Sequence, residues 1–315
     1  MREKKNFAQR SKVLASAEAR QKYFLVYEGE ETEQIYFDAV NERKDSLGIN
    51  PLIELVPVIR SYSEEGWSNP KKILDRVLLN LAEDKTQTIS YETLLNWIMD
   101  YLFEWKGLTK SGVMAKTVWN ALCTACQKAM QVRLQDDVSD IERSCMELLR
   151  ILEEETEIEH VVDDVPKIIK EQAITYAEGL DKICFIIDRD RESFFSSPGN
   201  DQYNYVLSKC KDNGFGFYLT NPCFEFWLLL HFDEVMNLDM KQLLENPKVT
   251  SKRRYTEQQL RALMPGFTKA KYNVDMLMQR IDKAISNEKQ FCEDDQKLEH
   301  TVGSRVGLLL EELRK

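Results

Sequence analysis

The stretch Lys182-Ile-Cys-Phe-Ile-Ile187, followed at once by Asp188-Arg189-Asp190, decides the fold. A run with almost no polar side chain is typical of a central parallel strand, because such a strand is buried on both faces. The charged triplet marks the end of that strand. We therefore expect an α/β protein whose sheet carries Asp188 and Asp190 at its carboxyl edge.

Other segments extend this pattern in both directions along the chain. Residues 23–27, 53–59 and 216–220 are short, apolar and rich in β-branched or aromatic side chains, which predicts strands. Helical spacing of apolar residues follows the first of these strands, and Pro70 is well placed to open another helix. The alternation of strands and helices predicts a mainly parallel, Rossmann-like sheet.

The middle of the chain interrupts the α/β pattern. Residues 82–175 show helical periodicity and no convincing strand, so we expect a large all-helical insertion there. The C-terminal part is also expected to be mostly helical. The expected division is a basic N-terminal tail (1–20), a first core half (21–81), the insertion (82–175), a second core half (176–240) and a helical C-terminal extension (241–315).

Charge is unevenly distributed along the chain. The formal net charge of −10 alone argues against a nucleic-acid partner. The expected insertion, however, holds 18 acidic and 10 basic residues, whereas residues 241–285 hold 10 basic and 4 acidic ones. A basic face that binds phosphate is compatible with this distribution, and so is an ordinary solvated surface. We take Lys252, Arg253 and Arg254 as candidates for nucleic-acid contacts.

Composition also bears on the environment of the protein. The seven Cys follow no secretory signal, and charged residues interrupt every apolar run before it reaches the length of a membrane span. We therefore expect a cytoplasmic protein with reduced thiols and no membrane association.

Acidic residues follow two of the expected strands. Glu28 comes directly after one of them, and Asp188 and Asp190 come directly after another. Parallel strands end at the same edge of a sheet, so these carboxylates are expected to converge. Clustered carboxylates repel one another unless a cation neutralises them, and oxygen ligands suit Mg²⁺ or Mn²⁺. A strand-end turn without a ligand is the ordinary alternative for either motif taken alone.

Two stretches resemble known families. Glu28-Gly29-Glu30-Glu31-Thr32-Glu33 together with Asp188-Arg189-Asp190 resembles the TOPRIM fold of topoisomerases, primases and OLD-type nucleases. The segment Asn221-Pro-Cys-Phe-Glu-Phe-Trp-Leu-Leu-Leu-His-Phe232 resembles the signature of RloB-like proteins, which include the AbiL second component of abortive-infection systems. The resemblance covers residues 20–81 and 177–315. The insertion departs from it, and we expect that segment to dock a partner or to mediate self-association into a homo-oligomer.

The resemblance implies a metal-dependent nuclease that acts in phage defence beside an ABC-type ATPase. Glu28 would be a metal ligand or general base, and Asp188 and Asp190 would bind metal. By the same analogy, Glu33 is a candidate ligand for a second ion, and Glu225 is a candidate to complete the cluster.

Two kinds of basic side chain remain as candidates near substrate. Related nucleases use a Lys near the scissile phosphate, where its charge suits a transient oxyanion, and Lys269 and Lys271 are candidates for that role. His231 follows an apolar helical run. A satisfied buried side chain is its ordinary interpretation, and contact with nucleic acid is the alternative that we retain.

The expected function is therefore Mg²⁺- or Mn²⁺-dependent endonucleolytic cleavage of DNA or RNA, tRNA included, by a toxic defence effector. The first alternative is a non-catalytic TOPRIM-like sensor or scaffold subunit of a defence complex. A second is strand passage or priming, for which the chain lacks an obvious Tyr-bearing breakage domain or zinc module.

Overall fold

A computed structural model of the chain divides into two compact units. It describes residues 21–29, 31–58, 69–86, 89–110, 112–156, 158, 161–162, 165, 176, 179–189, 194, 196–197, 200–251 and 253–315. The first unit takes in the described residues of Arg76–Glu178, and the second takes in those of Glu18–Val58, Trp67–Asp75 and Gly179–Lys315. The expected insertion, 82–175, falls within the first unit.

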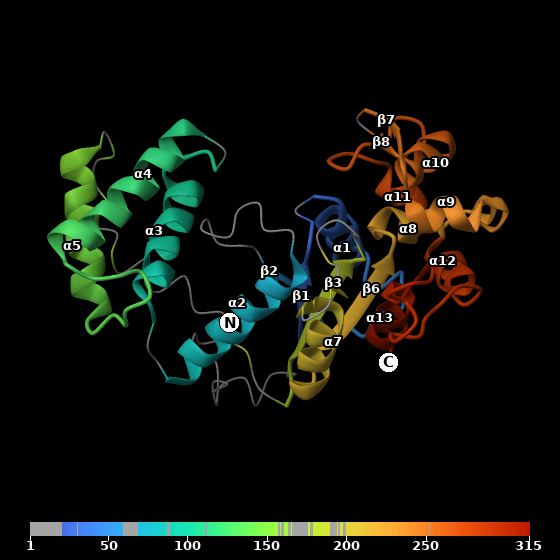
Figure 1. The fold of residues 1–315 in the computed structure, drawn as a ribbon, viewed down its shortest axis with the longest axis horizontal. Helices are drawn as coiled ribbons and strands as arrows, with labels where there is room; N and C mark the ends of the chain where they lie inside the picture. Colours follow the sequence, from blue (N-terminus) through green and yellow to red (C-terminus); the bar gives the residue numbers. More distant parts are fainter. Residues whose placement is uncertain are drawn as a thin grey trace. The chain divides into compact units, whose positions relative to one another are not determined.

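The second unit is built on a five-stranded sheet (Figure 1). Its strand order is β2 (Ile53–Val58), β1 (Gln21–Tyr27), β3 (Lys182–Asp188), β6 (Gly216–Asn221) and β9 (Gly303–Ser304). The first four strands are parallel, and β9 pairs antiparallel with β6. The mixed α/β fold with a mainly parallel sheet is thereby confirmed. The sequence did not indicate β9, because a two-residue strand has no periodicity of its own.

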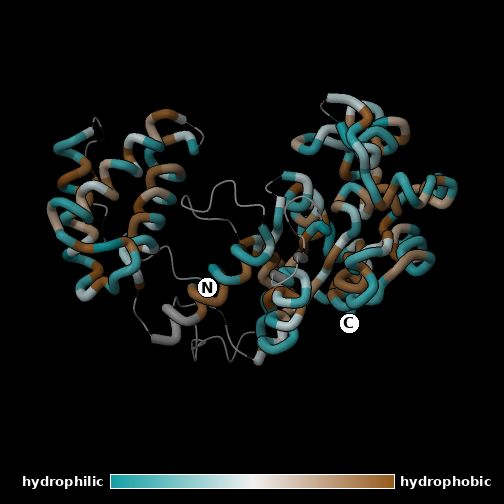
Figure 2. Tube along the Cα trace, viewed as in Figure 1, coloured by the Kyte–Doolittle hydropathy of each residue, from teal (hydrophilic) through white to brown (hydrophobic). Residues whose placement is uncertain are grey.

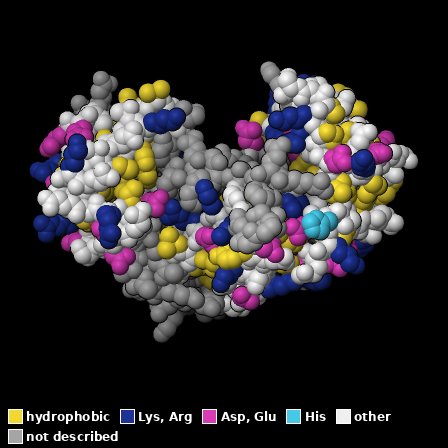
Figure 3. Space-filling model, in the orientation of Figure 1, with side chains coloured by type: hydrophobic (Ala, Val, Ile, Leu, Met, Phe, Trp, Pro, Cys, Tyr) yellow, Lys and Arg dark blue, Asp and Glu magenta, His cyan; other side chains and the backbone are white. Residues whose placement is uncertain are grey.

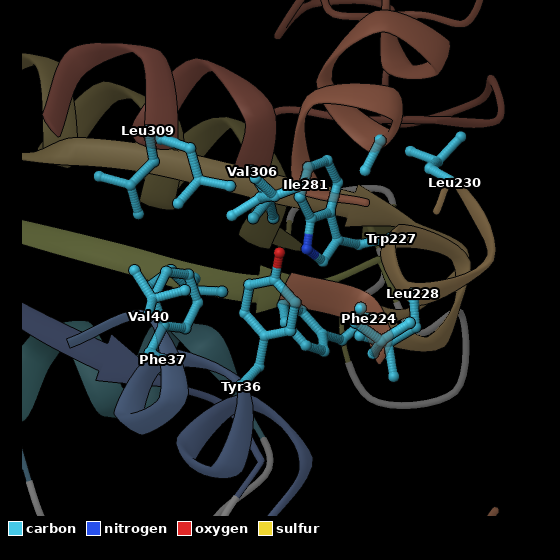
Figure 4. Packing of buried hydrophobic residues seen from close by; sticks show 14 of the residues in the cluster. Tyr36, Phe37, Val40, Phe224, Trp227, Leu228, Leu230, Ile281, Val306 and Leu309 are labelled. Atoms are coloured by element: carbon cyan, nitrogen blue, oxygen red, sulfur yellow. The ribbon is translucent and has the colours of Figure 1, made fainter. Parts of the chain in front are cut away.

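Side chains of the strands alternate between the two faces of the sheet, as the pleat requires. Tyr23, Leu25 and Tyr27 of β1 belong to one apolar core. Helices α1 (Thr32–Glu42), α8 (Phe224–Leu229), α12 (Ile281–Glu288) and α13 (Val306–Leu313) contribute to this core, and so do the helices that lie between α8 and α12 in the sequence. Figure 4 shows Tyr36 of α1 facing Phe224 and Trp227 of α8, with ring centroids 5.7 and 6.1 Å apart. These aromatic contacts join the first half of the core to the second.

Helix α7 (Gln202–Asp212) packs against side chains that lie outside that core. The ring of Tyr203 in α7 meets the ring of Phe217 in β6, with centroids 6.0 Å apart. Helix α2 (Pro70–Thr86) is joined to α7, since Tyr205 Oη donates a hydrogen bond to Asp75 Oδ1 at 2.7 Å. Helix α2 then carries the chain into the first unit.

The C-terminal part of the second unit adds short elements around α8. These are a 3₁₀-helix (Asp233–Asn237), α9 (Met240–Glu245), the hairpin β7 (Lys248–Thr250) and β8 (Arg253–Arg254), α10 (Tyr255–Leu263) and α11 (Val274–Met278). A further hairpin, β4 (Ser196–Ser197) and β5 (Asn200–Asp201), precedes α7. The sequence indicated neither hairpin.

The first unit has a helical core of its own. It contains α3 (Tyr91–Trp105), α4 (Val113–Thr124), a π-helix (Ala125–Ala129) and α5 (Ile141–Glu155). Ser90 and Asp140 cap α3 and α5 by accepting backbone N–H bonds, which the first turn of a helix otherwise leaves unmade. Figure 2 shows hydrophobic and hydrophilic residues alternating along these helices, and the apolar ones form a separate cluster.

Across the described ranges, no helix combines the length and the apolar character that crossing a membrane requires.

Candidate functional site

The carboxyl ends of β1 and β3 bring Glu28 and Asp188 together. The two strands are adjacent and parallel, with Tyr27 beside Ile186 in register. Glu28 Oε2 accepts a hydrogen bond from the backbone N–H of Asp188 at 2.9 Å. Asp188 Oδ1 accepts another from the backbone N–H of Phe224 at 2.8 Å. Both carboxylates are therefore held in place by the backbone of a neighbouring segment.

Glu33 joins this group from the first turn of α1. Its side chain is 4% exposed, and a Cβ atom on Gly29 would lie 2.2 Å from Glu33 Oε2. The loop after β1 therefore needs glycine at position 29 for the Glu33 carboxylate to occupy this place. Burial raises the pKa of Glu33 to about 7, and the nearby Glu225 carboxylate also raises it, while backbone N–H groups and Lys269 oppose the shift.

Glu225 and Lys269 form an ion pair at the same site. The distance from Lys269 Nζ to Glu225 Oε1 is 2.7 Å, and the Glu225 side chain is only 3% exposed whereas that of Lys269 is 54% exposed. Burial alone would raise the pKa of Glu225, but the Lys269 charge, together with hydrogen bonds from Lys269, Cys223 and the backbone, holds this pKa below its ordinary value. Glu257 of α10 also lies 3.8 Å from Lys269 Nζ. The Lys269 ammonium group therefore lies near both the Glu225 and the Glu257 carboxylates.

The site holds more carboxyl groups than Lys269 can neutralise. The pKa of Asp188 is raised well above its ordinary value by burial, and then by the charges of Glu33, Glu28 and Glu225, against which Lys269 acts in the opposite direction. Carboxylate oxygens are the donors that Mg²⁺ and Mn²⁺ prefer, so the chemistry of the donor set fits such an ion. Within the described ranges, however, no three His, Cys, Asp or Glu side chains are arranged to hold one. Asp190 lies outside the described residues.

A cavity of about 150 Å³ lies beside these groups. Its walls come from the end of β3, the loop before α8, the end of α9, and the start of α10. The charged residues that line it are Asp188, Arg189, Glu225, Glu245, Arg254, Glu257 and Lys269. Carboxylates and cations therefore face one space, as binding of both a metal ion and a phosphate would require.

Polar side chains that we did not predict tie the far wall of the cavity to the loop before α8. Asn246 Nδ2 donates to Cys223 Sγ at 3.4 Å, and Asn246 Oδ1 accepts from both N and Oγ1 of Thr256 at 3.1 Å. Asn246 adopts a left-handed conformation with φ of 40°. The sequence signal was an Asn directly before a Pro near the end of a short helix, which is typical of a helix C-cap.

The other predicted basic residues are placed as follows. Lys271 is exposed, and its backbone pairs with Thr268. Arg253 is exposed on β8, and Arg254 donates from Nη1 to the carbonyl oxygen of Asn246 at 3.2 Å. Figure 3 shows Lys and Arg side chains gathered in the region that carries β7, β8 and α10 in Figure 1. Lys252 lies outside the described residues.

The retained alternative for His231 is wrong. Its side chain is fully buried, Nδ1 lies 3.2 Å from the carbonyl oxygens of Trp227 and Leu228, and Nε2 lies 3.1 Å from Tyr36 Oη. Burial lowers the pKa of His231 to about 3, so the ring is neutral at ordinary pH. Nδ1–H donates to the carbonyls and Nε2 accepts from Tyr36. His231 is a satisfied core residue and does not contact nucleic acid.

Fold and site together define an α/β protein with an acidic site at the carboxyl edge of a parallel sheet. The RloB-like protein family model matches residues 120–313, which is more than half of the chain, and the chain belongs to the RloB-like family. The match takes in Asp188, Glu225 and Lys269 but begins after Glu28 and Glu33. It also includes residues 120–175, which we had expected to lie outside the resemblance. No curated protein and no solved structure matches the chain.

Proposed function

We propose that this chain is a TOPRIM-type endonuclease that cleaves nucleic-acid phosphodiesters with the aid of Mg²⁺ or Mn²⁺. The observation that carries the proposal is the hydrogen bond between Glu28 and the backbone of Asp188, residues that are 160 positions apart. That bond assembles carboxylates from two strands beside the Glu225–Lys269 ion pair. Membership of the RloB-like family adds support.

The acidic and basic side chains of the site have different proposed roles: the carboxylates hold the metal ion, and the basic side chains bind phosphate groups of the substrate. Glu28 and Asp188, whose carboxylates the backbone brings together, would hold the metal ion, with Asp190, Glu33 and Glu225 as further candidates. When bound, the ion would polarise the phosphodiester and lower the pKa of the attacking water. Backbone N–H groups of Asp188 and Phe224 fix the orientation of the first two carboxylates.

Lys269 would contact the scissile phosphate. Its ammonium group contacts the buried Glu225 carboxylate, and about half of its side chain is exposed to solvent. A fixed ammonium at this place stabilises negative charge as it develops on phosphate oxygens. Arg254, which lines the same cavity, would bind a neighbouring phosphate of the strand.

We also propose the biological setting that the family suggests. The nuclease would act as an abortive-infection effector controlled by an ABC-type ATPase, with the first unit as the docking or self-association module. The acidic composition of residues 82–175 supports a role away from phosphate.

One observation favours a second candidate, a non-catalytic sensor or scaffold subunit. In the part of the chain that the structure describes, no three ligating side chains are arranged for a metal ion. The two candidates differ in whether the purified chain has any metal-stimulated cleavage.

The test is to incubate the purified chain with plasmid DNA and with total RNA, with and without Mn²⁺, and to map the cut ends. Asp188→Asn is the inactive control, and Glu234→Gln, which changes an exposed carboxylate, is the matched active one. We expect cleavage that requires Mn²⁺ and Asp188. Equal cleavage by the Asp188→Asn protein would contradict the proposal, and no cleavage of either nucleic acid would favour the scaffold.

A further inference from the structure

The segment from α9 to α10 is attached to the acidic site through one buried side chain. Asn246 is 6% exposed and ends α9, where its backbone N–H donates to Gln242 O. Both polar atoms of its side chain are used. The amide nitrogen donates to Cys223 Sγ, and the amide oxygen accepts two hydrogen bonds from Thr256. Thr256 Oγ1 also lies 3.4 Å from Cys223 Sγ, so the three side chains form a closed triangle.

Each of these three residues lies next to a residue of the acidic site or contacts one that lines the cavity. Cys223 directly precedes Phe224, whose N–H binds Asp188, and stands two residues before Glu225. Thr256 is next to Glu257, the second carboxylate near Lys269. The backbone oxygen of Asn246 itself accepts the hydrogen bond of Arg254 Nη1. The triangle therefore fixes where the Arg254 guanidinium stands relative to the carboxylates.

We propose that Asn246 is a positioning residue that sets Arg254 against Asp188 and Glu225, so that a bound strand meets the guanidinium and the carboxylates at once. The inference rests on the proposed nuclease function. Asn246 touches neither metal nor phosphate in this role. It acts through the hairpin β7–β8, whose Arg253 and Arg254 extend into α10.

The backbone conformation of Asn246 allows its side chain to be removed without straining the backbone. At φ of 40° an Ala would add strain, whereas Gly occupies this region without penalty. Asn246→Gly therefore removes the side-chain triangle and preserves the helix end. Thr256→Val removes one hydroxyl with little change in shape, and Thr256→Ser, which retains the hydroxyl, is its matched control.

The experiment is a double-mutant cycle between Asn246→Gly and Arg254→Ala. Binding is measured by fluorescence anisotropy of a fluorescein-labelled strand of whichever nucleic acid the wild-type protein cleaves, in EDTA, over a range of salt concentrations. Single hydrogen bonds in proteins contribute about 0.5–1.5 kcal/mol, so we expect the Kd and KM of Asn246→Gly to rise by about three- to tenfold. We expect kcat and Mn²⁺ affinity, followed by Mn²⁺ electron paramagnetic resonance, to stay near the wild-type values.

The cycle separates positioning from general support of the fold. In the Arg254→Ala background, Asn246→Gly should not weaken binding further. Each single variant should lower the slope of log Kd against log salt concentration by about one. Thr256→Val should share part of the defect and Thr256→Ser should not.

If the two substitutions weaken binding additively, or if Asn246→Gly binds with wild-type affinity, Asn246 does not position Arg254. Cleavage by the wild-type protein would support the nuclease function in either case. If the wild-type protein neither binds nor cleaves nucleic acid, the proposed function fails and this role falls with it. Should Asn246→Gly fail to fold, the Thr256 pair decides the same question.

Discussion

The Glu28 carboxylate accepts the backbone N–H of Asp188 across the boundary between two adjacent parallel strands. A hydrogen bond from a backbone N–H costs no side-chain freedom on the donor side and is fixed by the register of the sheet. The relative placement of these two acidic residues therefore follows from strand pairing itself. Substitutions at this edge should change the chemistry of the site more than its shape.

Asp188→Asn should abolish cleavage and stabilise the fold. The Asn side chain can still accept from Phe224 N–H at Oδ1, but it lacks the buried charge that Glu33, Glu28 and Glu225 oppose. The free energy of unfolding in EDTA at neutral pH should therefore rise. Urea denaturation measures it. A less stable Asp188→Asn protein would contradict the repulsion described at this site.

Lys269→Met should lower kcat by about a hundredfold, the usual cost of removing one group that stabilises an oxyanion. It should also lower stability, because Glu225 is left buried without its partner. Lys271→Met, an exposed lysine two residues away, is the matched control and should keep wild-type activity.

The double variant Lys269→Met/Glu225→Gln separates these two effects. It should recover stability, since no unpaired charge remains, and it should not recover cleavage. Equal loss of activity in Lys269→Met and Lys271→Met would count against a specific role for Lys269.

Gly29→Ala should impair metal binding without unfolding the protein. The added Cβ would lie 2.2 Å from Glu33 Oε2, so the carboxylate must move, and the end of a Glu side chain can do so. We expect weaker Mn²⁺ binding in calorimetric titrations and a melting temperature close to that of the wild type. Gly214→Ala is the comparison variant. Gly214 has a φ of 68°, so an Ala at this position is strained, and the substitution should lower stability without changing Mn²⁺ binding. Unchanged Mn²⁺ affinity in Gly29→Ala would remove Glu33 from the site.

Glu288→Gln should remove a pH dependence of stability. Glu288 is buried in α12 and accepts from Gly307 N–H, and burial raises its pKa from 4.5 to about 7. Between these values the folded protein keeps a proton that the unfolded chain has lost, so stability falls as pH rises through this window. The loss amounts to at most about 3 kcal/mol.

Urea denaturation between about pH 5 and pH 8 would show this slope in the wild type and in Glu234→Gln, and a flatter one in Glu288→Gln. A wild-type protein that gains stability over this range would be incompatible with a raised pKa at Glu288.

The sequence predicted the elements whose pattern is local and missed those that depend on distant contacts. Strand β3 is an unbroken apolar run, and helices α3 and α5 repeat apolar residues along one face, so both are visible in the sequence. Strand β9 has two residues and is defined by the pairing of Gly303 and Ser304 with Asn221 and Thr220 of β6. The meeting of Glu28 with Asp188 follows from parallel strand ends.

Other parts of the site could not be predicted in this way. Lys269 reaches Glu225 from a loop after α10, and its position depends on packing of the whole C-terminal region. The same holds for Asn246, whose partners Cys223 and Thr256 are 23 and 10 residues away. For His231 the sequence left both burial and nucleic-acid contact open, because an apolar run gives no measure of how deeply its last residue is buried.

The adjacency of β1 and β3 determines when the proposed centre can form during synthesis of the chain. Strand β1 is translated before helices α3, α4 and α5 of the first unit, its partner β3 is translated after them, and Lys269 follows later still. A nascent chain therefore cannot assemble the proposed centre until β3 and the segment that carries Lys269 have been synthesised. If the proposed function is right, products of premature termination before β3 would lack the nuclease centre.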